Sequence, residues 1–112
     1  MDNSHLTQGH CVPCEGGTEP MKNEEVSTYL TFLKSPWEVS TDGKSLSKQF
    51  KFKDFDESMV FVNKIADVAR EQGHHPDISI YYNKVDILLT THAIGGLSTN
   101  DFIMASKIES IS

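Results

Sequence analysis

The fold is decided by residues 56–89, which read DESMVFVNKIADVAREQGHHPDISIYYNKVDILL. The first half of this stretch predicts a long amphipathic helix, capped by Asp56 and ended by a left-handed Gly73. The predicted apolar stripe consists of Met59, Val62, Ala66 and Ala69, flanked by Ile65 and Val68. The second half predicts a β-hairpin, because apolar residues alternate on both sides of a turn at Asn83-Lys84.

A shorter helix and another hairpin are predicted before this stretch. Asn23 can cap a short helix that Pro36 stops. Its apolar face has helical spacing and consists of Val26, Tyr29, Leu30 and Leu33. Two alternating runs between residues 37 and 52 flank the turn pair Asp42-Gly43, which is typical of a hairpin. Lys48 falls on the apolar side of the second run, so we expect that strand to bulge or fray there.

The last part of the chain predicts a third helix. Ser98 and Asp101 have the spacing of a capping box, which opens the helix after a loop over residues 94–97. The strand that begins at Val85 is expected to end at His92. The element order is then α-β-β-α-β-β-α. Hairpins joined by a helix predict an α+β domain, with a four-stranded antiparallel sheet and helices packed on one face.

Length and composition fit one ordinary globular domain, with 112 residues, 38% hydrophobic and 23% charged. Residues 1–22 are polar and aperiodic and predict a flexible tail, which leaves residues 23–112 as the domain. The net charge of −6 disfavours nucleic acid as a partner, because phosphate contacts need Lys and Arg. Without a long apolar run or a signal-peptide pattern, we expect no membrane association and a cytoplasmic location.

Three of the five histidines fall in the last forty residues. His74 and His75 directly follow a predicted helix end, and His92 ends a predicted strand. Histidine titrates near neutral pH, so it suits proton transfer at cellular pH. Each of these positions also has a structural explanation: a polar pair at a helix end, an edge-of-sheet residue and, for Asp101, a helix cap. The residues alone leave both kinds of explanation open.

A second constellation lies in the tail, where Cys11-x-x-Cys14 stands near His5 and His10. These are zinc-ligand types, but a structural zinc site needs four ligands and usually a second paired motif. We therefore expect a free cysteine pair and no metal, with a small zinc module as the weaker alternative.

One ordered set of motifs is more specific than any of these features. It consists of Gly73-His74-His75-Pro76-Asp77, Tyr82-Asn83-Lys84-Val85, Thr91-His92, Gly96-Leu97-Ser98 and Asp101. The set resembles the pterin-4a-carbinolamine dehydratase family, as do residues 37–39 and 50–55. The resemblance covers about residues 20–110. Two positions depart from the family pattern, since Arg70 stands where an acidic residue is frequent and Gly73 where Asp is frequent.

The resemblance implies a fold, an activity and a site. The family's antiparallel sheet of four strands, backed by helices, agrees with the fold predicted above. The implied activity is dehydration of 4a-hydroxytetrahydropterin to quinonoid dihydropterin, with the pterin as substrate and with neither metal nor bound cofactor. By motif, the three histidines that line the pterin site are His74, His75 and His92, and Thr91 and Asp101 belong to substrate binding. Our hypothesis makes His75 and His92 the acid–base pair and gives His74 an orienting role.

The resemblance also implies partners. The reaction recycles the cofactor of aromatic amino acid hydroxylation, so an aromatic amino acid hydroxylase is a candidate partner in the same pathway. Family members form homo-oligomers, and we expect a dimer or tetramer. Some also serve as dimerisation cofactors of a homeodomain transcription factor. The alternative function is therefore that of an oligomeric regulatory cofactor with little or no catalysis.

Overall fold

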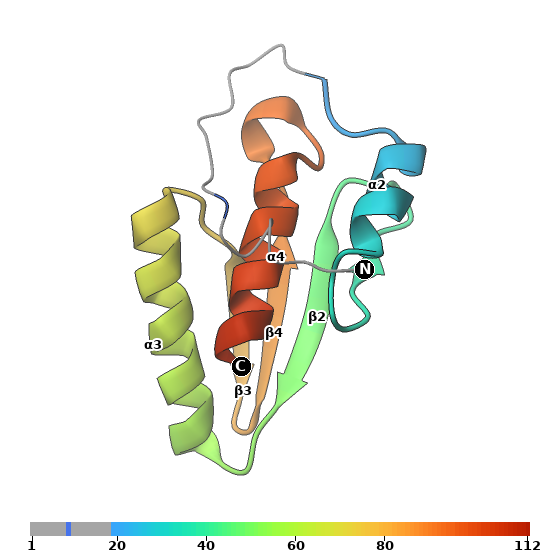
Figure 1. The fold of residues 1–112 in the computed structure, drawn as a ribbon. Coiled ribbons are helices and arrows are strands. Elements are labelled where there is room, and N and C mark those ends of the chain that lie inside the picture. Colours follow the sequence, from blue (N-terminus) through green and yellow to red (C-terminus); the bar gives the residue numbers. More distant parts are fainter. Residues whose placement is uncertain (1–8, 10–18) are drawn as a thin grey trace.

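The computed structural model describes Gly9 and residues 19–112. The cysteine pair and the first two histidines lie outside the described residues. The helices and strands, in chain order, are α2 (Asn23–Leu30), β1 (Glu38–Val39), β2 (Leu46–Lys51), α3 (Phe55–Gln72), β3 (Asp77–Tyr81), β4 (Lys84–Leu89), the 3-10 turn η1 (His92–Ile94) and α4 (Thr99–Ile111). Apart from η1, this is the predicted order, which the structure confirms (Figure 1).

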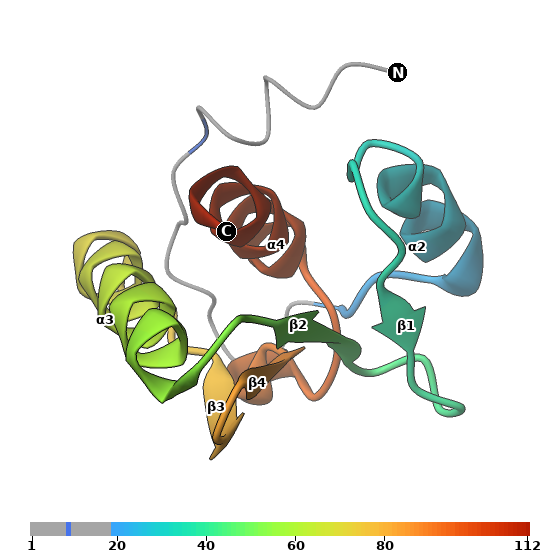
Figure 2. The same ribbon diagram turned by 90° about the horizontal axis from the view of Figure 1, so that it is seen from below.

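The four strands form one antiparallel sheet in the order β1-β2-β4-β3. All three helices lie on the same face of the sheet, with α4 between α3 and α2 (Figure 2). The predicted α+β architecture is therefore confirmed. Within the described part of the chain, no helix combines the length and the apolarity needed to cross a bilayer.

The core lies between the sheet and the helices. Phe50 of β2 and Val85 of β4 are cross-strand neighbours, and both are buried under the helices. Phe61 of α3 packs against Phe50, with 4.8 Å between the ring centroids. Every residue of α4 from 100 to 106 is buried, since this helix has a neighbouring helix on each side and the sheet beneath it. The start of α4 is thus buried inside the molecule.

Two details of α3 correct the prediction. Its N-cap is Asp54 rather than Asp56, because the Asp54 backbone is extended and its side chain accepts the Glu57 N–H at 2.9 Å. The buried face is also rotated by one residue: it consists of Ser58, Phe61, Ile65, Ala69 and Gln72. The large Phe61 ring is in contact with the Phe50 ring of β2, which explains the rotation. The predicted terminator is confirmed, since Gly73 has φ 65°.

The first helix is shorter than predicted. Its N-cap is Lys22 rather than Asn23, and it ends at Leu30, well before Pro36. The next residues form tighter turns, and the backbone N–H groups of Lys34 and Ser35 donate to the Glu109 carboxylate at 3.0 and 2.8 Å. These bonds to α4 replace the bonds of a continued helix.

Both hairpins are present, and the second turns one residue earlier than predicted. Tyr81 pairs with Lys84, so the turn is Tyr82-Asn83, and Tyr82 takes a positive φ of 48°. The predicted turn at Asp42-Gly43 is confirmed by the positive φ of 72° at the glycine. The bulge or fraying expected at Lys48 is absent from β2, whose register is unbroken. The Lys48 ammonium lies 5.2 Å from the centroid of the Phe50 ring. This side chain therefore covers part of the aromatic ring and makes a cation–π contact with it.

The end of β4 also differs from the prediction. The strand stops at Leu89, and His92 opens η1 instead of ending the strand. Thr91 and Gly96 form an isolated antiparallel bridge, in which the Thr91 N–H donates to the Gly96 carbonyl at 2.9 Å. This bridge closes a small loop that carries His92.

Candidate active site

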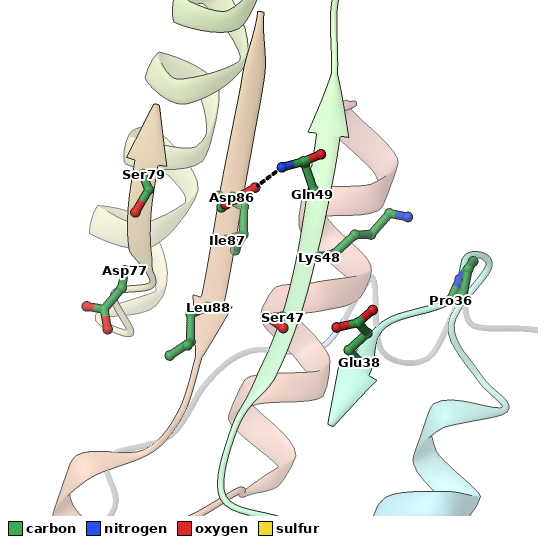
Figure 3. Close-up of a pocket in the computed structure, with 10 residues that line it drawn as sticks. All are labelled: Pro36, Glu38, Ser47, Lys48, Gln49, Asp77, Ser79, Asp86, Ile87 and Leu88. Atoms are coloured by element: carbon green, nitrogen blue, oxygen red, sulfur yellow. Dashed lines mark hydrogen bonds between the residues drawn. The ribbon is translucent and has the colours of Figure 1, made fainter. Parts of the chain in front are cut away.

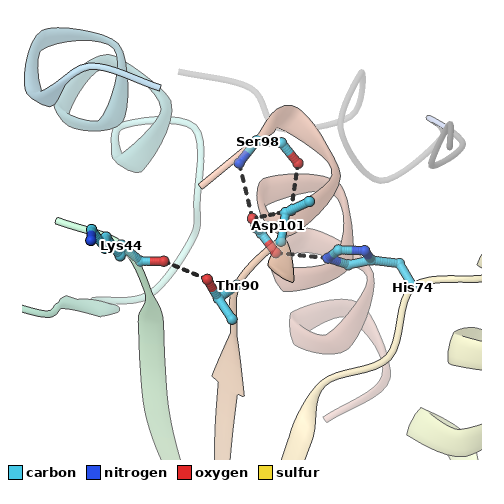
Figure 4. A network of polar contacts seen from close by, with 6 residues as sticks. Lys44, His74, Thr90, Ser98 and Asp101 are labelled. Atoms are coloured by element: carbon cyan, nitrogen blue, oxygen red, sulfur yellow. Dashed lines mark hydrogen bonds and ion pairs between the residues drawn. The ribbon is translucent and has the colours of Figure 1, made fainter. Parts of the chain in front are cut away.

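A buried carboxylate meets a histidine where the chain after α3 passes the start of α4 (Figure 4). His74 follows Gly73, the residue that ends α3, and Asp101 lies in the first turn of α4. His74 Nε2 and Asp101 Oδ1 are 2.7 Å apart. The His74 side chain is 13% exposed and the Asp101 side chain is fully buried. One edge of the imidazole therefore faces the protein while part of the ring stays accessible.

The second oxygen of Asp101 has partners of its own. Oδ2 accepts the Thr91 hydroxyl at 2.8 Å and the Ser98 backbone N–H at 2.9 Å. The Thr91 and Ser98 hydroxyl oxygens are 2.8 Å apart. A buried charge is tolerated only when it is paired and hydrogen-bonded. With His74, these donors satisfy the carboxylate and hold three segments of the chain together.

The direction of these hydrogen bonds follows from which groups can donate a proton and which can only accept one. An ionised carboxylate only accepts hydrogen bonds, so the proton in the His74–Asp101 contact sits on His74 Nε2. In the neutral ring, Nδ1 is then left as an acceptor. Thr91 uses its one hydroxyl proton on Asp101, so the Ser98 hydroxyl donates to Thr91. Asp101 thereby sets both the orientation and the tautomer of His74.

The other two predicted histidines lie beside this network but do not join it. His75 and His92 are both exposed. They directly follow His74 and Thr91, the two residues that Asp101 holds. The structure therefore brings His74, Thr91 and Asp101 into contact, and presents His75 and His92 to solvent next to them in the chain.

Ser98 belongs to the network although the sequence indicated only a capping role for it. The capping box predicted for Ser98 and Asp101 is present. The same N–H that the box requires is one of the three donors to the Asp101 carboxylate. The spacing of Ser98 and Asp101 in the sequence therefore predicted the helix cap, but it did not predict the contact with His74.

A hollow of about 650 Å³ lies elsewhere, on the sheet face opposite the helices (Figure 3). It is lined by Pro36, Glu38, Ser47, Lys48, Gln49, Asp77, Ser79, Asp86, Ile87 and Leu88. A hydrogen bond of 2.8 Å between Gln49 Nε2 and Asp86 Oδ1 spans β2 and β4 there. None of the predicted site residues lines this hollow, so we identify the site by the polar network and not by the hollow.

Arg70, which departs from the family pattern, lies on the exposed side of α3, where its guanidinium pairs with Asp67 at 3.0 Å. In the part of the chain that the structure describes, no three His, Cys, Asp or Glu side chains gather as metal ligands would. The predicted zinc alternative at Cys11 and Cys14 lies outside that part.

Comparisons with known proteins find one family. The family model described as pterin 4 alpha carbinolamine dehydratase matches residues 19–111. A protein of Nitrosomonas eutropha, provisionally named as a pterin-4-alpha-carbinolamine dehydratase, is 42% identical over 104 residues, which are 93% of this chain and 90% of the relative. A Legionella pneumophila protein with the same provisional name is 41% identical over 108 residues, or 96% of each chain.

Solved structures show the same fold. The crystal structure of a transcriptional coactivator/pterin dehydratase from Brucella melitensis has a TM-score of 0.78 and 31% identity, covering 83% of this chain and 98% of that one. A pterin dehydratase-like protein, described as a RuBisCO assembly factor of the alpha-carboxysome, has a TM-score of 0.61 and 20% identity, over 70% of this chain and 90% of that one. The second likeness concerns the fold alone. Together with the family match, these relatives show that the chain belongs to the pterin-4a-carbinolamine dehydratase family.

Proposed function

We propose that this chain dehydrates 4a-hydroxytetrahydropterin to quinonoid dihydropterin. The proposal is supported by membership of the family. One observation connects the proposed function with particular residues: His74 contacts the buried Asp101 carboxylate at 2.7 Å. A carboxylate that fixes an imidazole at the start of α4 provides a positioned polar group for a substrate, beside the exposed rings of His75 and His92.

The reaction requires two proton movements. A proton must reach the leaving hydroxyl as the C4a–O bond breaks, so that water departs. A proton must also leave N5, whose electron pair then forms the new C=N bond. Two imidazoles in different protonation states can supply both steps, each worth about 10²–10⁴-fold in rate. No oxidant, reductant or metal is needed for this balance.

We assign these steps to the exposed histidines. His75 and His92 act as the acid–base pair, because their rings are open to solvent and to a bound ligand. His74 orients the substrate through its free Nδ1, since Nε2 is engaged by Asp101. Thr91 and Asp101 serve substrate binding indirectly, because their oxygens are bonded within the protein and hold His74 in position.

The experiment that tests this function follows the dehydration of synthetic 4a-hydroxytetrahydropterin by stopped-flow absorbance. We expect acceleration well above the spontaneous rate, without added metal or cofactor. The Ser79→Ala variant is a matched control, because Ser79 is exposed on β3 and lines the hollow that contains none of the histidines. A wild-type rate equal to the spontaneous rate would refute the proposal.

A second candidate function is favoured by the description of the Brucella melitensis relative as a transcriptional coactivator as well as a pterin dehydratase. On this alternative, the chain is an oligomeric cofactor of a protein partner and catalyses little or nothing. The same assay separates the two functions. Sedimentation or light scattering adds the oligomeric state, for which we propose a dimer or tetramer.

A further inference from the structure

A short segment before α2 crosses the loop that carries His92. The Met21 backbone N–H donates to the Leu97 carbonyl at 2.8 Å. A Cβ atom added to Gly96 would stand 2.6 Å from the Pro20 Cβ and 3.4 Å from its Cγ. Pro20 and Met21, which we name the crossing segment, therefore lie directly on the backbone of the loop.

Gly95 and Gly96 are adjacent in this loop, and each position favours glycine for a different reason. Gly95 has a positive φ of 68°, which favours glycine, but a Cβ atom there would meet nothing within 4 Å. Gly96 does not have a positive φ, but Pro20 lies directly against it. Since real Cβ atoms do not approach another carbon within 3.0 Å, a side chain at Gly96 must displace either the crossing segment or the loop.

The loop is coupled to the site at both ends. Gly96 forms the backbone bridge with Thr91, and His92 lies in the loop that this bridge closes. The Thr91 hydroxyl donates to Asp101, whose other oxygen contacts His74. A displacement at Gly96 therefore reaches His92 through the backbone, and reaches His74 through two hydrogen bonds.

We propose that the contact between Pro20 and Gly96 is a positioning element of the site. The crossing segment holds the loop in place, and the loop fixes the backbone of His92 and the hydroxyl of Thr91. Pro20 and Gly96 act through these residues and touch no substrate. The kinetic readout of this inference rests on the proposed dehydratase function, whereas its spectroscopic readout does not.

The test is a compensation experiment with Gly96→Ala, Pro20→Gly and the double variant. Gly96→Ala should lower kcat roughly tenfold or more, because small misplacements of reacting groups can cost about 10²-fold. Pro20→Gly alone removes the contact and should itself lower kcat. In the double variant the methyl group added at position 96 takes the space of the two removed ring carbons, so most of the kcat lost in Gly96→Ala should return. The control is Gly95→Ala, with and without Pro20→Gly. Any loss of kcat in Gly95→Ala comes from the positive backbone φ at this position, so removal of the Pro20 ring should not restore it.

The spectroscopic arm follows the His92 imidazole by NMR at constant pH. We expect Gly96→Ala to shift the His92 ring resonances, and the double variant to restore them. A loss of thermal stability with unchanged His92 resonances and unchanged kcat would overturn the inference, as would failure of the double variant to recover either readout.

Two other outcomes also decide the question. If Gly96→Ala does not fold, Pro20→Gly alone should speed amide exchange at Ile94 and Gly95, whose N–H groups bond back to Thr91 and His92. Unchanged exchange there would contradict the positioning role. If the wild-type chain shows no dehydration, the proposed function fails, while the NMR comparison still tests the contact.

Discussion

Asp101 uses its two carboxylate oxygens for two kinds of partner. Oδ2 accepts the Ser98 N–H that opens α4, and Oδ1 contacts His74. The structural and the functional explanations of this residue are therefore compatible, because one carboxylate can serve both. Sequence spacing predicts the cap, since a capping box is local. It does not predict the contact with His74, which lies 27 positions away and depends on how α3 and α4 pack.

The first prediction concerns the proposed acid–base pair. His75→Ala and His92→Ala should each lower kcat by about 10²-fold or more, because each removes one proton-transfer group. Steady-state dehydration kinetics measures the effect, with circular dichroism to verify folding. Both side chains are exposed, so we expect little change in stability. A kcat within twofold of wild type for either variant would remove that histidine from the pair.

The second prediction separates the two roles of Asp101. In Asp101→Asn the amide oxygen can still accept the Ser98 N–H, so the cap should persist and the melting temperature should change little. The amide nitrogen is a donor, however, and cannot accept the proton on His74 Nε2. We expect kcat to fall on the order of tenfold to a hundredfold. An unchanged rate with asparagine would leave Asp101 with the capping role alone.

At the scale of elements, periodicity predicts which elements form better than where they begin. The order of helices and strands follows from alternation, helical spacing and turn pairs. The exact start of α3 does not, because Asp54 and Asp56 are both good caps and only the backbone conformation distinguishes them. Likewise, two overlapping apolar stripes compete on α3, and packing of Phe61 against β2 selects one of them.

The third prediction concerns Asp54 and Asp56 and tests which of them caps α3. Asp54→Ala removes an observed side-chain cap and should reduce the free energy of unfolding by about 1 kcal/mol. Asp56→Ala is the matched control, since Asp56 lies in the first turn and loses only a favourable charge near the helix dipole. Urea denaturation of the two variants gives the comparison. Equal losses would contradict the assignment of Asp54 as the cap.

On the scale of the whole molecule, the fold places the candidate site at one end of the helix layer. The segment after α3, the loop after β4 and the first turn of α4 all meet at Asp101 (Figure 4). The hollow on the opposite sheet face is separate from this network (Figure 3). In a chain of 112 residues, the core and the site therefore share α4.

The fourth prediction tests the core on which this arrangement depends. Phe61→Ala should reduce the free energy of unfolding by about 3–5 kcal/mol, because the buried ring contacts Phe50 and Phe52 and its removal leaves a cavity. Val60→Ala, at the neighbouring position, is the control: its side chain is 56% exposed and its loss should matter little. Chemical denaturation measures both. Similar losses for the two variants would contradict the observed rotation of α3.

The most direct test of the central claim compares the wild-type chain with a variant in which His74, His75 and His92 are all alanine. Both are assayed for dehydration of 4a-hydroxytetrahydropterin at the same protein concentration, after circular dichroism has shown that both are folded. We predict that the wild-type chain accelerates the reaction and that the triple variant leaves it at the spontaneous rate. A triple variant that retains the wild-type rate, or a wild-type chain that gives no acceleration, would contradict the account.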